Sequence, residues 1–295
     1  MTADTVFTGL RFVFDCSALL LWGSAIYLRV LVEPALSERI WRQMRPLRIA
    51  ASWLICAATI AALPVRTAML GNGWPDAADG AMMLDVLFHT GVGTAWIWQA
   101  LGALALASSS AFSDPRNRMM VTALAAGFLL TGLATIGHAA MHAGIFGFVH
   151  KASDVLHLLS VGSWVGALIP VFLILRPACA GIFAAECRIA LIRFSTAGHV
   201  AVAVALLTGV INTLMIVGGP PTDWSTPYQM LLSLKIAAVC MMLALALANR
   251  YLIVPRLSRR PEAMAWLRAG TLAEVAIALA VVGLVAIFGM LEPFP

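Results

Sequence analysis

The chain has 295 residues, of which 61% are hydrophobic and 11% charged, and its mean hydropathy is +0.93. These values exclude an ordinary soluble domain and indicate a membrane protein. One crossing of the bilayer takes about 20 apolar residues, so the length allows about eight transmembrane helices and leaves no room for a separate soluble domain. We therefore predict an all-α, polytopic membrane helix bundle, with residues 1–295 forming a single integral-membrane domain.

Eight apolar segments follow one another with short connections between them. By residue number they are 8–28, 49–70, 82–106, 119–140, 153–175, 194–217, 230–254 and 271–290. Each is about as long as a helix that crosses the hydrocarbon core. The sequence therefore predicts one transmembrane helix for each segment.

The basic residues are distributed unevenly between these connections. The connections after segments one, three, five and seven, with the adjoining segment ends, hold 15 of the 19 Lys and Arg residues; the other three hold only Lys151. Cytoplasmic loops carry the excess of Lys and Arg in membrane proteins. We therefore predict that both termini are periplasmic. The net charge of +5 reflects this topology, so the expected partner is the lipid bilayer and no nucleic acid.

Residues 137–157 hold four of the six histidines, together with a methionine and an aspartate. In the predicted topology, polar side chains from four segments gather at the periplasmic ends: Asp15, Asp85, His89, His138, Met141, His142, His150, Asp154 and His157. Ionisable groups in or near hydrocarbon are costly, and they usually face the bundle interior or a wet cavity. This clustering favours a metal-ligand or proton-relay role over a purely structural one.

The spacing within this group predicts shared helix faces. Three pairs are three or four residues apart: His138 with His142, Asp85 with His89, and Asp154 with His157. Imidazole suits copper, zinc, iron and nickel, and a thioether favours Cu(I). The aspartates either compensate charge or accept the second ring N–H of a histidine and fix its tautomer.

Several residues also have a structural interpretation. His150 lies next to Lys151 in a predicted connection, where a hydrogen-bonded helix-end histidine is expected. Met141 by itself would be ordinary core packing, since the chain has 14 methionines. The glycines of residues 162–166 predict close helix packing. Deeper polar residues either continue a polar path inward or form interhelical hydrogen bonds and snorkelling contacts: His199, Asn212, Lys235 and Glu274.

Several short motifs occur together in a characteristic order. They are G-H-A at 137–139, D-x-x-H with W-x-G at 154–166, R-F-S at 193–195, G-x-x-N at 209–212, and L-L-S-L-K to N-R-Y-x-x-x-P at 231–255. In this order the chain resembles the copper resistance D (CopD) family of bacterial inner-membrane proteins, over essentially its whole length. The resemblance is most specific from residue 137 to residue 255.

The resemblance implies a plasma-membrane protein that moves copper from periplasm to cytoplasm. It also implies a separate periplasmic copper-binding partner of the CopC type. His138 and His157 are the positions that match the family's metal-handling site. His142, Met141 and His89 are added by their spacing. We expect these five residues to form a copper entry site, with Asp85, Asp154 and Asp15 as second shell and with His199 and Asn212 along the pathway.

Two alternatives remain open at this point. Helix-borne histidines also permit bis-histidine ligation of haem b in a membrane electron carrier, through pairs drawn from His89, His138, His157 and His199. A copper receptor that binds without transporting is the second alternative. An enzyme is not expected otherwise, because no nucleophile with a base at usable spacing and no GxxxxGK[ST] motif stands out.

Overall fold

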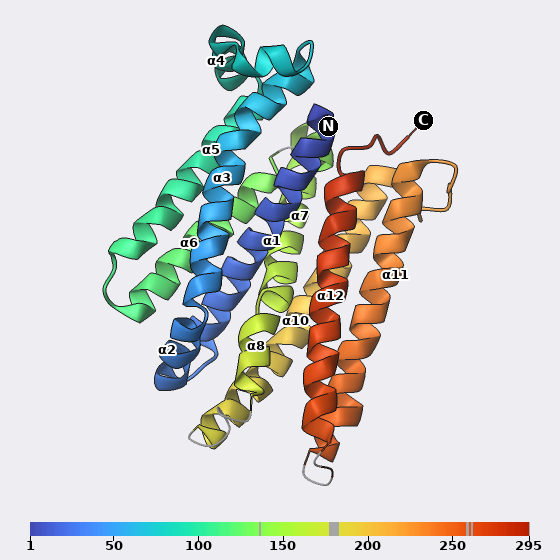
Figure 1. The fold of residues 1–295 in the computed structure, drawn as a ribbon. Coiled ribbons are helices and arrows are strands. Elements are labelled where there is room, and N and C mark those ends of the chain that lie inside the picture. Colours follow the sequence, from blue (N-terminus) through green and yellow to red (C-terminus); the bar gives the residue numbers. More distant parts are fainter. Residues whose placement is uncertain (136, 177–182, 258–259, 261, 295) are drawn as a thin grey trace.

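A computed structural model describes residues 1–135, 137–176, 183–257, 260 and 262–294. The longer helices are α1 (Ala3–Val30), α2 (Pro34–Gln43), α3 (Arg45–Leu70), α4 (Gly80–His89), α5 (Gly91–Ser108), α6 (Pro115–Leu133), α7 (Gly144–Val165), α8 (Leu168–Ile174), α10 (Ala184–Val217), α11 (Pro227–Ala248) and α12 (Ala263–Phe288). Short helical turns lie between them: η1 (Trp74–Ala78), η2 (Ser109–Ala111), η3 (Gly137–Ala140), η4 (Asn249–Ile253) and η5 (Val254–Arg256). The predicted all-α membrane bundle is confirmed (Figure 1).

The number of candidate membrane spans differs from the prediction. Six stretches of the described chain are long and apolar enough to cross: Ala3–Val30, Arg45–Leu70, Gly144–Ile174, Ala184–Val217, Pro227–Arg256 and Ala263–Phe288. The predicted third and fourth spans correspond to α5 and α6, which have 18 and 19 residues and pack against each other beside α3 and α1 (Figure 1). Neither is among the six. α5 begins only after Thr90, and two arginines occupy the first turn of α6.

Three predicted boundaries are wrong, and each has a local cause. Thr90 is extended, and its Oγ1 accepts a hydrogen bond of 3.1 Å from Gly93 N. It therefore caps α5 and separates it from α4 within the predicted span 82–106. The predicted span 119–140 ends early, because α6 stops at Leu133; residue 136 lies outside the described residues. The predicted span 153–175 begins late, because α7 already starts at Gly144.

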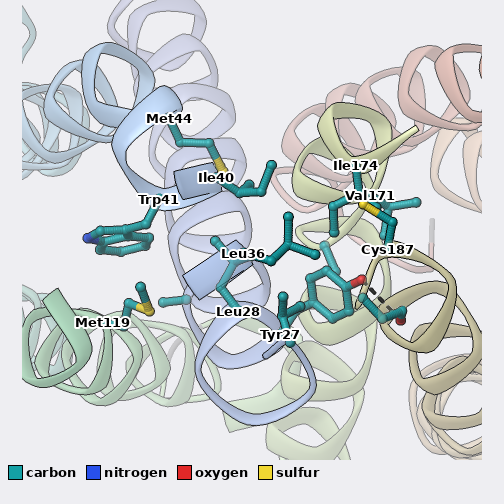
Figure 2. Packing of buried hydrophobic residues seen from close by; sticks show 14 of the residues in the cluster. Tyr27, Leu28, Leu36, Ile40, Trp41, Met44, Met119, Val171, Ile174 and Cys187 are labelled. Atoms are coloured by element: carbon teal, nitrogen blue, oxygen red, sulfur yellow. Dashed lines mark hydrogen bonds between the residues drawn. The ribbon is translucent and has the colours of Figure 1, made fainter. Parts of the chain in front are cut away.

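Helix α1 lies at the centre and packs against α3, α6, α7 and α12. Both termini lie at the same end of the bundle, at the top of Figure 1 together with α4; we call this the upper end and the opposite one the lower end. Near the lower end a buried apolar cluster joins α1 and α2 to α6, α8 and α10 (Figure 2). Within it, Tyr27 Oη donates a hydrogen bond of 3.2 Å to the carbonyl oxygen of Ala190.

The contact between α1 and α7 is close enough to require glycine. A Cβ atom added to Gly166 would clash with the carbonyl oxygen of Leu19, and one added to Gly23 would clash with the carbonyl oxygen of Gly162. Beside this contact, Trp22 Nε1 donates a hydrogen bond of 2.9 Å to the carbonyl oxygen of Leu159. The predicted close helix packing of residues 162–166 is confirmed, and it fixes α7 against the central helix.

Candidate functional site

A cavity of about 240 Å³ lies among α1, α7, α10, α11 and α12 in the upper half of the bundle. We call it the upper cavity. Most of its wall is apolar. Its ionisable and amide side chains are Arg11 and Asp15 from α1, His138 from η3, His150, Asp154 and His157 from α7, Asn212 from α10, and Tyr228 and Lys235 from α11. Four of the residues singled out from the sequence as metal-site or second-shell candidates, together with Asn212, therefore face one space.

His157 is held in one tautomer by its neighbours on α10. Its Nδ1 lies 3.0 Å from the carbonyl oxygen of Ala205 and 3.1 Å from Thr208 Oγ1. A carbonyl oxygen can only accept a hydrogen bond, so Nδ1 carries the proton of the neutral ring. The lone pair is then on Nε2, the arrangement in which a histidine binds a metal while its other nitrogen is anchored.

His138 is anchored in the opposite sense, through the C-terminal segment. Its Nε2 lies 3.1 Å from the carbonyl oxygen of Leu291, so Nε2 donates and Nδ1 holds the lone pair. The ring also packs against Tyr228, with 5.0 Å between the ring centroids. Burial lowers the pKa of His138, and the hydrogen bond to the Leu291 carbonyl acts in the opposite direction. A neutral ring with a free nitrogen is thus favoured.

The turn between α6 and α7 brings a second pair of imidazoles together. Gly137 and Gly144 both have positive φ, 67° and 60°, a region open to glycine, and they bound this turn. His142 Nδ1 lies 3.2 Å from His150 Nδ1, and His150 is buried and lines the upper cavity. The expectation that His150 is a helix-end residue in a connection is therefore wrong. Its spacing to Asp154 and His157, four and seven residues along α7, is the sequence signal that could have found it.

The predicted common helix face of His138 and His142 is also wrong. η3 is a 3₁₀ turn that ends at Ala140, so His142 lies beyond it, outside any helix. His138 lines the upper cavity itself. His142 does not line it, but it contacts His150, which does.

Charged groups of both signs surround the histidines. Arg11 Nε lies 3.7 Å from Asp15 Oδ2, and Asn212 Nδ2 donates a hydrogen bond of 3.1 Å to Asp154 Oδ1. Lys235 is close enough to Asp154 to interact with it electrostatically. Within the described chain, Asp15 Oδ1 and Asn212 Oδ1 are buried without a hydrogen-bond partner. These two oxygens are acceptors that a cation, or water around it, would satisfy.

Two of the charged residues show what the sequence analysis missed. The site predicted from the sequence does not include Arg11, and Lys235 has an equally good structural interpretation there. Both lie inside predicted transmembrane segments, where a basic residue is costly and normally faces a site. A basic residue within an apolar segment is therefore the sequence signal that could have found them, and both line the upper cavity.

Other predicted site residues lie elsewhere. Asp85 and His89 do contact each other across one turn of α4, with 3.1 Å between Oδ1 and Nδ1, but their side chains are 73% and 74% exposed at the upper end. Met141 is exposed and does not line the upper cavity. His199 lies in the lower half, where its Nε2 is 3.1 Å from Tyr251 Oη. The structure therefore does not bring these residues to His138 and His157.

The upper cavity offers individual ligands and no preformed chelate. Across the residues that the structure describes, no three His, Cys, Asp or Glu side chains converge closely enough to hold a metal ion. His138, His150 and His157 line the same space without such convergence.

The fold and the site define a multi-pass membrane bundle with a histidine-lined cavity, and comparison with known proteins gives its family. Residues 1–148 match the model of the copper resistance protein D-like N-terminal domain, and residues 188–288 match the copper resistance protein D model. The chain belongs to the copper resistance protein D family, as the resemblance of its motifs predicted.

Named relatives agree with this assignment. The chain is 35% identical to the inner membrane protein YebZ of Escherichia coli (strain K12), over 97% of each chain. It is 31% identical to copper resistance protein D of Pseudomonas syringae pv. tomato, over 98% of this chain and 97% of the relative. It is 28% identical to the copper transport protein CutJ of Bacillus subtilis (strain 168), over 95% of this chain and 52% of the relative. No solved structure matches the chain. The protein is thus a multi-pass inner-membrane protein of a copper-handling family.

Proposed function

We propose that the protein binds copper in the upper cavity and passes it toward the lower end, from periplasm to cytoplasm. The observation that carries the proposal is that His138, His150 and His157 all line one cavity of the helix bundle. Copper is the proposed transported ion, because the family is one of copper resistance and because imidazole is a good copper ligand.

The direction rests on the distribution of charge. Of the 19 Lys and Arg residues, 15 fall in or beside connections on one side of the predicted topology. The positive-inside rule makes that side cytoplasmic. The upper end, with both termini and the upper cavity, then faces the periplasm.

Each histidine has a distinct part in the proposed site. His157 binds copper through Nε2 and His138 through Nδ1, since their other ring nitrogens are hydrogen-bonded to backbone carbonyl groups. His150 supplies a third imidazole and is oriented by His142. Asp154 and Asp15 compensate the positive charge. The exposed residues Met141 and His89 have no part in this version of the site.

We further propose that the two regions matched by family models act as one domain and receive copper from a separate periplasmic protein of the CopC type. In support of a single domain, α1 contacts α3 and α6 from the first region and α12 from the second. The partner is implied by the family resemblance, and a periplasmic upper cavity would be accessible to it.

Copper binding and copper flux into proteoliposomes test the proposal together. We expect the purified protein to bind and transport copper, and His138→Ala/His157→Ala to lose both while still reaching the membrane. His89→Ala is the matched control, because His89 is exposed and outside the cavity. Unchanged uptake in the double variant would sink the site. Binding without flux would identify a receptor, and a Soret band in the purified protein would identify a haem carrier.

A further inference from the structure

A second cavity, of about 400 Å³, lies in the lower half of the bundle among α7, α8, α10, α11 and α12. We call it the lower cavity. Its wall is mostly apolar. The polar side chains in it are Arg188, Ser195 and His199 from α10, Asn249 and Arg250 from η4, and Thr271 and Glu274 from α12. In the described chain Glu274 is the only acidic residue of this wall.

The two cavities are separated by a thin apolar layer. Trp164, Val202 and Leu206 line both of them. Trp164 is buried and packs with Met242 and Ala278, so this layer contains no charged side chain. Apolar constrictions of this kind exclude ions until they open. The shared side chains therefore lie between the upper and the lower cavity.

Glu274 is buried, with 5% of its surface exposed, and Asn249 Nδ2 donates a hydrogen bond of 2.6 Å to its Oε1. No Lys, Arg or His of the described chain forms an ion pair with it, although other charges face the same space. The titratable groups that face the lower cavity are Arg188 and His199 from α10 and Arg250 from η4, while the lining residues of α7 and α8 are all apolar. A single neutral donor does not offset the cost of a buried carboxylate.

The backbone around Asn249 is shaped to direct its amide toward Glu274. α11 ends in a π-helical turn, Asn249–Ile253, and such turns occur frequently at functional sites. Opposite it, a Cβ atom at Gly270 would clash with Asn249 Oδ1, so glycine makes room for the amide. Asn249 Oδ1 is buried and has no hydrogen-bond partner among the described residues. An acceptor beside a carboxylate is thus left unsatisfied.

We propose that Glu274 and Asn249 form a second cation site, on the inner side of the Trp164 layer. The site takes one cation, a proton or a copper ion, at the Glu274 carboxylate. The oxygen of Asn249 that has no partner among the described residues accepts a hydrogen bond from the protonated acid, or coordinates the copper ion. The inference rests on the proposed function, because it makes the lower cavity the station that an ion reaches after leaving the upper one.

Copper flux and copper binding, measured on the same proteoliposome preparations, test this second site. We expect Glu274→Gln to keep copper binding in the upper cavity while flux falls by about tenfold or more, because the charge that compensates the crossing ion is lost. Glu274→Asp should restore part of the flux. Glu262→Gln, the same change at an exposed position just before α12, should leave it unchanged.

Two further measurements distinguish a copper ion from a proton at the second site. If it is copper, the wild-type protein binds one more copper ion than Glu274→Gln. If it is a proton, the two bind equally, and only the wild-type flux depends on pH at the lower side. Flux of Glu274→Gln at the wild-type rate overturns the second site alone, as does loss of upper-cavity binding in this variant. Absence of flux in the wild type overturns the proposed function instead.

The wild-type protein provides a measurement that does not depend on a variant folding. A hydrophobic carbodiimide modifies protonated carboxyl groups within the bilayer, and mass spectrometry locates the product. We expect Glu274 to be labelled, and we expect copper, or a pH gradient imposed at fixed lower-side pH, to change the labelled fraction. Labelling that neither treatment changes, or no labelling of Glu274, overturns the second site.

Discussion

Asn212 Nδ2 donates a hydrogen bond of 3.1 Å to Asp154 Oδ1 and so joins α10 to α7, helices whose bonded residues are 58 positions apart in the sequence. His157 is anchored to the same helix through the carbonyl oxygen of Ala205, one turn of α7 below Asp154. The carboxylate and the imidazole are thus positioned by one partner helix, and their relative geometry depends on the α7–α10 contact.

Removal of the Asn212 amide should weaken that contact. Asn212→Ala leaves the half-buried Asp154 carboxylate without its donor, and we expect the free energy of unfolding to fall by about 1–3 kcal/mol. Thermal unfolding in detergent measures the loss. Thr196→Ala is the control, because Thr196 is on the same helix and its hydroxyl bonds only to its own helix, at the Ile192 carbonyl oxygen. Equal melting temperatures for the two variants would contradict the role of the hydrogen bond.

Substitution by alanine should change the stability in opposite directions at two glycines, one at the α1–α7 contact and one on an open part of α1. Gly166→Ala places a methyl group against the backbone of Leu19, which cannot move aside as a side chain does, and we expect a loss of about 1–3 kcal/mol. Gly9→Ala meets nothing within 4 Å, and in helix α1 it should stabilise the protein by about 0.5–1 kcal/mol. Denaturation midpoints of the two variants that shift in the same direction would refute this packing.

The lowered pKa of His138 predicts how stability depends on pH. The unfolded chain has an ordinary histidine pKa of about 6.5, so below that pH it takes up a proton that the folded ring resists. Stability should therefore fall as the pH drops below about 6.5, by at most about 1.4 kcal/mol per pH unit from this group, and His138 should contribute nothing to the slope above it. His138→Gln should show a shallower fall between pH 7.5 and 5.5. Parallel melting curves for the two proteins would rule out this titration.

Copper affinity should depend on whether a residue lines the upper cavity, and not on how near it lies to His138 in the sequence. His150 is buried in the cavity wall, whereas Met141 is exposed outside it. We expect His150→Ala to weaken copper binding by about tenfold or more, the range found when a ligand or its support is lost, and Met141→Ala to leave it unchanged. Copper titration of the purified variants measures both. If Met141→Ala weakened copper binding and His150→Ala did not, the site predicted from the sequence, with Met141 as a ligand, would be supported instead.

Some features of the site follow from local signals in the sequence, and others depend on how the helices pack in the bundle. The three-residue spacing of Asp154 and His157 was enough to predict that both face one site, because helix periodicity is a local property. The same reasoning paired Asp85 with His89 correctly, since they are in contact on α4. It could not show that α4 carries them to an exposed part of the upper end, because the direction of a helix face depends on its neighbours in the bundle.

His150 illustrates a different failure. The charged residue Lys151 interrupts the apolar pattern, so the sequence predicts that the fifth segment begins after it and that His150 lies in a connection. In the structure α7 begins at Gly144, and Lys151 is exposed while His150 faces inward. A single lysine on the outer face of a helix is thus compatible with a buried histidine beside it, which hydropathy along the sequence does not resolve.

The hydrogen bond between His138 Nε2 and the Leu291 carbonyl oxygen has a practical consequence for work on this protein. The last few residues of the chain select which nitrogen of a proposed copper ligand is free. An affinity tag fused at the C-terminus, or trimming of that tail, would therefore perturb the imidazole as well as the end of the chain. Metal measurements are better made on protein tagged at the N-terminus, with the C-terminal residues left as they are.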